Sequence, residues 1–158
     1  VVEVLRDEGS GAHFELSGND MVELALAKAR PVAEARGVRL AADITSTTLI
    51  PARRASLAAL ALYNLLQNAI EATASGRTVR IGARGQASLE FTVTDEGPGL
   101  PTAVRAQLFQ PCTSSKLGGS GLGLALSQQL ARHAGGRIEL LRSDEQGTSF
   151  RLVLDPES

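Results

Sequence analysis

Asn64, Asn68 and Glu71 are the first group of side chains in this sequence that could do chemistry. They fall within a helical pattern at 56–74, and their spacing places them on one side of that helix. Such a polar stripe is often only a solvated helix face. Asparagine is nevertheless a mediocre helix former, so two of them in one central turn weaken the helix without a packing gain. Because a carboxamide oxygen is a suitable ligand for Mg²⁺, a metal site is the alternative.

Asp95 is the second candidate, because it follows a predicted strand at 88–94 and opens the segment Asp-Glu-Gly-Pro-Gly. A strand that ends in this way is commonly followed by no more than a tight turn. In the alternative, the Asp95 carboxylate accepts a hydrogen bond from an exocyclic amine such as adenine N6. Gly97 and Gly99 would then allow the backbone to pass close to a flat ring.

A glycine-rich segment at 118–124 is the third candidate, because it opens a predicted helix at 122–134. Backbone N–H groups at such a helix start can bind phosphate, although a flexible hinge explains the glycines equally well. The segment is neither a Walker A loop nor the dinucleotide fingerprint, whose spacings differ. Phe109 would anchor the polar loop at 110–121 that precedes the helix. Within that loop, Lys116 could reach a phosphate as a point charge or could simply be solvated.

The elements that must position these groups follow from hydrophobic periodicity. Strands are expected at 13–16, 38–44, 48–52, 78–83, 88–94, 137–142 and 148–154, and helices at 21–36, 56–74, 102–109 and 122–134. Ser17 to Asp20 supply capping residues for the first helix, and Pro31 could kink or break it. The order predicts one α+β domain over 1–158, with a loose segment at 1–11. Its architecture would be a two-layer sandwich, a mixed and mostly antiparallel sheet covered by helices on one face.

Composition excludes several other classes of protein. Hydrophobic residues make up 43% and charged residues 21% of the chain, which is typical of a folded globular domain. The net charge of −1 and the scarcity of aromatic residues argue against a nucleic-acid partner and against contact with an anionic membrane. The single cysteine, Cys112, excludes an internal disulfide and fits a reducing compartment.

The expected location is cytoplasmic. No apolar run approaches the ~20 residues of a membrane span, and the N-terminus has no signal-peptide pattern. A membrane anchor elsewhere in a longer protein is left open.

Four segments, in order, resemble the N, G1, F and G2 boxes of the GHKL superfamily, which includes histidine kinases, type II topoisomerases, a mismatch-repair ATPase and a heat-shock chaperone. They are NLLQNAIEA at 64–72, DEGPGL at 95–100, LFQPCTSSK at 108–116 and GGSGLGLAL at 118–126. The resemblance extends over 51–154. It is closest to histidine kinases, because the ATP-hydrolysing members place a water-activating glutamate where this chain has Asn64.

The resemblance implies a Bergerat-type ATP-binding fold with ATP and Mg²⁺ as ligands. Asn68 would ligate Mg²⁺ and Asn64 would line the phosphate site. Asp95 would bind adenine N6, with Gly97 and Gly99 on either side of the ring. The remaining implied contacts lie in a lid over the nucleotide, at Lys116, Gly119, Ser120, Gly121, Leu122 and Gly123.

The sequence departs from the family pattern at two positions. Cys112 stands where a second phenylalanine is usual, which puts the anchoring of the lid in question, and Glu71 stands where many members carry a lysine directed at the γ-phosphate. Neither His13 nor His133 precedes an acidic residue, as a phosphoacceptor histidine would. His13 is expected in a strand and His133 at a helix C-terminus, where its charge favours the dipole.

The resemblance therefore implies the catalytic domain of a histidine kinase. Its partners would be a separate dimerisation domain that carries the phosphoacceptor histidine and a downstream response regulator. Two alternatives stay open, a stand-alone serine kinase of the anti-sigma type and a module that serves only as a partner surface.

Overall fold

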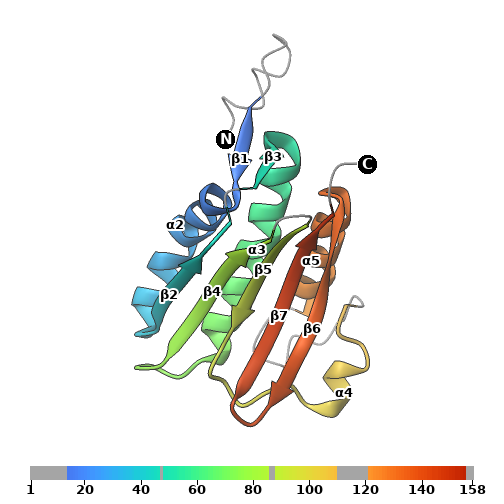
Figure 1. The fold of residues 1–158 in the computed structure, drawn as a ribbon. Helices are drawn as coiled ribbons and strands as arrows, with labels where there is room; N and C mark the ends of the chain where they lie inside the picture. Colours follow the sequence, from blue (N-terminus) through green and yellow to red (C-terminus); the bar gives the residue numbers. More distant parts are fainter. Residues whose placement is uncertain (1–13, 47, 86–87, 110–120, 156–158) are drawn as a thin grey trace.

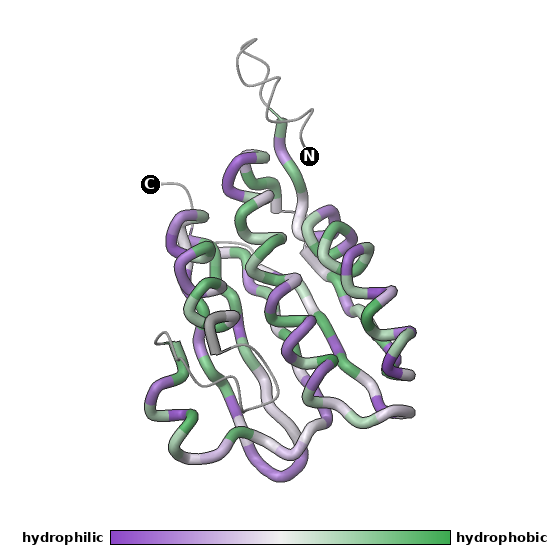
Figure 2. Tube along the Cα trace, turned by 180° about the vertical axis from the view of Figure 1, so that it is seen from behind, coloured by the Kyte–Doolittle hydropathy of each residue, from purple (hydrophilic) through white to green (hydrophobic). Residues whose placement is uncertain are grey.

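The computed structural model describes residues 14–46, 48–85, 88–109 and 121–155. The elements are β1 (Glu15–Ser17), α2 (Gly18–Arg36), β2 (Arg39–Ile44), β3 (Leu49–Pro51), α3 (Ala52–Ala72), β4 (Thr78–Arg84), β5 (Leu89–Thr94), α4 (Thr102–Arg105), α5 (Gly121–His133), β6 (Gly136–Asp144) and β7 (Gly147–Leu154). Helices α2, α3 and α5 lie side by side across one face of the large sheet (Figures 1 and 2).

The large sheet has the strand order β2-β4-β5-β7-β6. The pair β2–β4 is parallel, whereas β4–β5, β5–β7 and β6–β7 are antiparallel. Strand β5 shows how the layers form, because Leu89, Phe91 and Val93 are buried while the residues between them point to the other face. The predicted α+β sandwich, with a mixed and mostly antiparallel sheet and helices on one face, is confirmed.

Helix α2 begins with a capping box. The Ser17 hydroxyl accepts a hydrogen bond from the Asp20 N–H at 3.1 Å, and the Asp20 carboxylate accepts one from the Ser17 N–H at 2.9 Å. Of the two outcomes considered at Pro31, a kink or a break, the break does not occur, since the helix continues to Arg36. Proline leaves the carbonyl four residues earlier without a donor, but Ala27 and Pro31 are both exposed, so water can solvate that carbonyl.

Helix α3 is the central helix of the layer, and α2 and α5 pack on either side of it (Figure 2). It starts at Ala52, earlier than the predicted 56, and buries Leu62, Leu65 and Leu66 against the sheet. Near its start, Arg54 donates from Nε to the Ala134 carbonyl at 2.7 Å. The start of α3 therefore lies beside the end of α5, and the two helices run in opposite directions (Figure 1).

Three short elements differ from expectation. Strands β1 and β3 pair with each other as a separate two-stranded sheet, which their sequences did not predict. Helix α4 ends at Arg105 rather than at 109. The Gln107 N–H bonds to the Val104 carbonyl, three residues back, so the chain leaves the α-helical pattern there and continues as turns.

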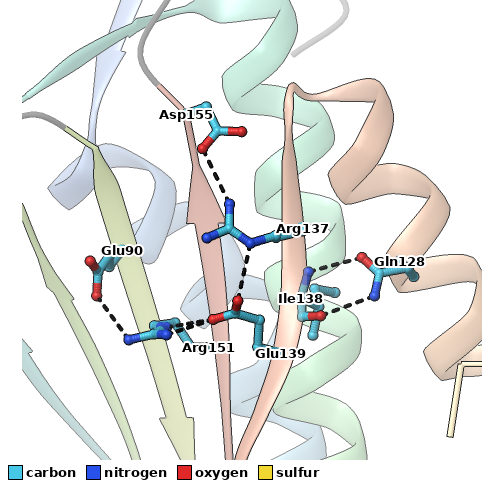
Figure 3. Close-up of polar contacts among 7 residues, drawn as sticks. All are labelled: Glu90, Gln128, Arg137, Ile138, Glu139, Arg151 and Asp155. Carbon is cyan, nitrogen blue, oxygen red and sulfur yellow. Dashed lines mark hydrogen bonds and ion pairs between the residues drawn. The ribbon is translucent and has the colours of Figure 1, made fainter.

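Hydrogen bonds and ion pairs from side chains on α5 and on the uncovered face of the sheet stabilise its β6–β7 side (Figure 3). Gln128 of α5 bonds both backbone groups of Ile138, donating to its carbonyl at 3.0 Å and accepting from its N–H at 2.9 Å. On the uncovered face, Arg151 donates to Glu139 at 2.6 Å and lies 3.6 Å from Glu90. Hydrogen bonds from Arg151 and Arg137 lower the pKa of Glu139. The uncovered face is thus polar and cross-linked.

Candidate functional site

The polar stripe predicted on α3 is present. Asn64, Asn68 and Glu71 are all half-buried, beside the buried residues Leu65 and Ala69. Within the described part of the chain, none of the three side chains takes part in a hydrogen bond or ion pair. Two asparagines therefore occupy the middle of a helix, at a cost in helix propensity, with their carboxamides available to a ligand.

Asp95 follows β5 and is 6% exposed. Its Oδ1 accepts hydrogen bonds from the Gly97 N–H at 2.9 Å and from the Thr148 N–H at 3.0 Å. Among the described residues, nothing donates to Oδ2. Burial raises the pKa of Asp95 from its ordinary value, against the two backbone donors and the charge of Arg142, which lower it. Oδ1 therefore stabilises a tight turn, as one of the two interpretations predicts. Oδ2 has the capacity to accept a hydrogen bond from a ligand.

The two glycines of the Asp95 loop are required by contacts with the protein itself. A Cβ on Gly97 would come within 2.5 Å of the Ala72 carbonyl oxygen at the end of α3. Gly99 has a φ of +85°, and a Cβ there would collide with the Asp144 carbonyl of the β6–β7 hairpin. These contacts bring the loop close to both the end of α3 and the hairpin, which accounts for the glycines without a bound ring. Their predicted place beside adenine stays a prediction.

The β6–β7 hairpin supplies contacts to the Asp95 loop that the sequence did not predict. Besides the Thr148 N–H, the Ser143 hydroxyl accepts from the Leu100 N–H at 2.7 Å and lies 3.0 Å from the Thr148 hydroxyl. Glu96 fixes the other side of the loop by accepting from the Thr78 N–H at 2.9 Å. The contact of the hairpin with the Asp95 loop follows from the strand order of the sheet, not from residue types in either segment. Antiparallel pairing of β5 with β7 places the start of β7 beside the end of β5, as the register Thr94↔Ser149 shows.

The start of α5 lies toward the same end of the helix layer as the end of α3 (Figure 1). Arg54 is joined to Ala134 just beyond α5, and α5 contains 13 residues. Counting about 13 residues along α3 from Arg54 leads to the turn that carries Asn68, since both helices rise ~1.5 Å per residue. The partial positive charge at the start of α5 therefore lies level with the two asparagines.

Only part of the predicted lid belongs to the described residues. Phe109 packs edge to face against Phe150 of β7, with ring centroids 6.3 Å apart, as expected of an anchor for the loop. The Gly123 carbonyl accepts from the Ser127 hydroxyl at 2.7 Å inside α5. Gly121 and Leu122 form the first residues of α5. The remaining predicted lid contacts, Lys116, Gly119 and Ser120, lie outside the described residues, as do Cys112 and His13.

Two features are absent from the described residues. No group of three or more histidine, cysteine or carboxylate side chains in them could hold a metal ion. None of their helices is long and apolar enough to cross a membrane.

Residues 54–158, about two thirds of the chain, match the family model described as histidine kinase-, DNA gyrase B-, and HSP90-like ATPase. The chain belongs to this ATPase family. Within it, the C4-dicarboxylate transport sensor protein DctS of Rhodobacter capsulatus is 35% identical over 151 residues, which cover 89% of this chain and 22% of that protein. The sensor histidine kinase MtrB of Mycobacterium bovis is 31% identical over 98% of this chain and 29% of its own length.

A solved structure gives the same result. The mycobacterial sensor histidine kinase MprB aligns with a TM-score of 0.73 at 25% identity, covering 91% of this chain and 97% of that one. The predicted assignment to the ATP-binding catalytic domain of histidine kinases, and ATP as its nucleotide, are confirmed at the level of the domain. The chain spans less than a third of the two curated relatives, so the activity of the whole protein belongs to the next section.

Proposed function

We propose that this domain binds Mg-ATP and donates the γ-phosphoryl group to a histidine on a separate dimerisation domain. The observation that carries the proposal is the position of three features at one end of the fold. Asp95 Oδ2, the carboxamides of Asn64 and Asn68, and the start of α5 lie toward the same end of the fold, where α3, β5 and the β6–β7 hairpin end. A purine amine, a metal-bound triphosphate and an anion, respectively, are the ligands that these groups suit.

The adenine would lie against the Asp95 loop. Its exocyclic amine would donate to Asp95 Oδ2, while Oδ1 keeps its two backbone donors and holds the carboxylate in place. Because Asp95 is only 6% exposed, this hydrogen bond would be shielded from water and therefore sensitive to a missing amine. Gly97 and Gly99 would contribute the close backbone surface beside the ring.

The phosphates would lie between α3 and the start of α5. Asn68 fits Mg²⁺, because its half-buried carboxamide supplies one neutral oxygen and phosphates and water supply the other ligands. When bound, the ion would offset charge on the β- and γ-phosphates. Asn64 would line the phosphate site from the preceding turn. Gly119, Ser120, Gly121, Leu122 and Gly123 would contact the phosphates, with Lys116 as a further charge from the lid.

The chemical step would take place at the boundary with the partner domain. The histidine nitrogen would form a bond to the γ-phosphorus as the bond from that phosphorus to the β–γ bridging oxygen breaks, and ADP would leave. The proton of the imidazole would pass to a base on the dimerisation domain. This domain's contribution is then positioning and electrostatic stabilisation, which supply most of the catalysis in phosphoryl transfer. The phosphohistidine would then donate its phosphoryl group to a response regulator. Both reactions would take place in the cytoplasm.

A transfer assay tests the proposal. The chain of residues 1–158 is incubated with radiolabelled Mg-ATP, alone and together with the dimerisation hairpin of the same gene. Alone it should form no acid-labile, alkali-stable phosphate, whereas with the hairpin the label should appear on the hairpin. Label at His133 or His13 would contradict the assignment, as would calorimetry that detects no binding of Mg-ATP at millimolar concentration. Transfer to a serine of an added protein would favour the serine-kinase alternative.

A further inference from the structure

A groove of about 790 Å³ lies in the helix layer, and its lining includes none of the described residues of the proposed nucleotide site. It is lined by Leu24 and Lys28 of α2, by the first half of α3 from Arg53 to Leu60, and by His133 at the end of α5. From Leu60, the groove residue of α3 nearest to that site, the helix advances 4 residues to Asn64 and 8 to Asn68, or about 6 and 12 Å. The groove therefore occupies the start of α3, at the upper end of the helix layer in Figure 1, and ends about one helical turn before Asn64.

The lining of the groove combines apolar and basic side chains. Leu24 and Leu57 are half-buried, and Leu60 is 40% exposed although it belongs to the central helix. The basic residues are Lys28, Arg53, Arg54 and His133, and no carboxylate from the described residues belongs to the lining. A local excess of positive charge on a chain of net charge −1 indicates a surface that suits an acidic partner.

The cations of the groove are not neutralised by carboxylates within the described part of the chain. Arg53 has no hydrogen-bond or ion-pair partner there. Arg54 donates to the backbone carbonyls of Ala134 and Asp155, each at 2.7 Å, rather than to a carboxylate. Lys28 lies 5.8 Å from the centre of the Tyr63 ring. Their charge is thus available to carboxylates from outside.

We propose that this groove binds an acidic amphipathic helix of a partner protein. Leucines from two neighbouring helices form a slot that the apolar ridge of a third helix fits, and the cations around it would pair with carboxylates beside that ridge. A membrane surface fits less well, because the leucines lie within a groove among basic side chains rather than on a protruding face that enters lipid. Lys28 and the two arginines come from two helices, which suits several carboxylates along one segment better than one small anion.

The test uses designed probe peptides of about 16 residues, long enough to form a helix. The acidic probe carries leucines at positions i, i+3, i+4 and i+7 with flanking glutamates. One control peptide replaces the glutamates by lysines, and a second keeps the composition but scrambles the leucines. Amide chemical-shift mapping locates the binding surface on the 1–158 chain, and fluorescence anisotropy measures affinity. The acidic probe should bind at least about tenfold more tightly than either control, with shifts at Leu24, Leu57 and Leu60.

Variants of the chain then separate charge from apolar contact. Arg53→Glu should lower the affinity for the acidic probe about five- to tenfold, and Leu60→Ser should lower it about tenfold. Arg80→Glu is the matched control, since Arg80 is exposed on β4, in the sheet rather than in the helix layer, and should change affinity less than about twofold. Unchanged ADP affinity and a dispersed amide spectrum show that each variant is folded.

Several results would overturn the proposal. They are the absence of shifts at about 1 mM acidic probe, equal binding of the acidic and lysine peptides, and shifts that map outside the groove. Binding to phosphatidylglycerol vesicles that Arg53→Glu abolishes, without binding of the peptide, would show a membrane-facing surface instead.

Discussion

Replacing Asp95 by asparagine separates the two oxygens of its carboxylate. In the variant, the carboxamide oxygen can keep the place of Oδ1 and its hydrogen bonds from the N–H groups of Gly97 and Thr148. The amide nitrogen then takes the place of Oδ2, where it presents a donor to the adenine amine, which is itself a donor. The loop should therefore survive while its recognition of adenine is lost.

The magnitude follows from the burial of the site. A hydrogen bond to a charged group in a shielded position is worth about 1.5–3 kcal/mol, so ADP affinity should fall roughly ten- to a hundredfold. Stability should change little, because both backbone donors keep an acceptor and a buried charge is removed. Asp95→Ala is the contrasting variant. It leaves the two N–H groups without a partner and should destabilise the domain by about 2–6 kcal/mol.

An inosine nucleotide makes the assay more specific. Hypoxanthine carries a carbonyl oxygen where adenine carries the amine, so the new amide of Asp95→Asn can donate to it. Calorimetric titration of parent and variant with ADP and with IDP should show ADP weakened and IDP strengthened in the variant. If Asp95→Asn binds ADP like the parent and gains nothing with IDP, Asp95 is only a turn residue and the adenine assignment is wrong.

Three further predictions test other parts of the structure. Asn68→Ala should lower the affinity for nucleotide in the presence of Mg²⁺ and largely keep the affinity for metal-free ADP. A titration of parent and variant with and without Mg²⁺ would show this difference. An equal loss of affinity in both conditions would exclude Asn68 as the Mg²⁺ ligand. Because burial raises the folded-state pKa of Asp95 above 3.8, folding favours its protonated form. The parent should thus lose unfolding free energy relative to Asp95→Asn as pH rises from 3.8 through the raised pKa, and urea titrations that show a pH-independent difference would refute this. Gln128→Met should cost about 2–6 kcal/mol, because it orphans the buried N–H and carbonyl of Ile138, whereas Gln129→Met on the exposed side of α5 should cost less than about 0.5 kcal/mol.

Local patterns predicted the parts of the site that depend on one element. The helical period placed Asn64 and Asn68 on one side of α3, and the alternation that ends at Thr94 placed Asp95 at the end of β5. Both signals arise from a repeat within a single segment, which neighbouring elements do not change. The sandwich followed for the same reason, from the order of hairpins and helices.

Contacts between distant segments could not be predicted in this way. The Thr148 N–H that holds Asp95 Oδ1 comes from 53 residues further along the chain, and a backbone N–H leaves no mark in residue type. The glycines illustrate the same limit. Their predicted reason was a flat ligand, whereas the structure shows close approach to the Ala72 carbonyl and a positive φ at Gly99. The sequence identified Gly97 and Gly99 as positions that need glycine. Only the structure shows that the neighbouring backbone at Ala72 and Asp144 is the reason.

The asparagines of α3 have a cost that only a ligand would offset. Each lowers helix propensity by about 0.5 kcal/mol relative to alanine. Within the described residues, neither side chain regains this through a hydrogen bond, although both are half-buried beside the core. A helix selected for stability alone would carry alanine or leucine there, as it does at Leu65 and Ala69. Alanine at either position should therefore leave the domain as stable as the parent or more so, which is how a binding residue differs from a structural one.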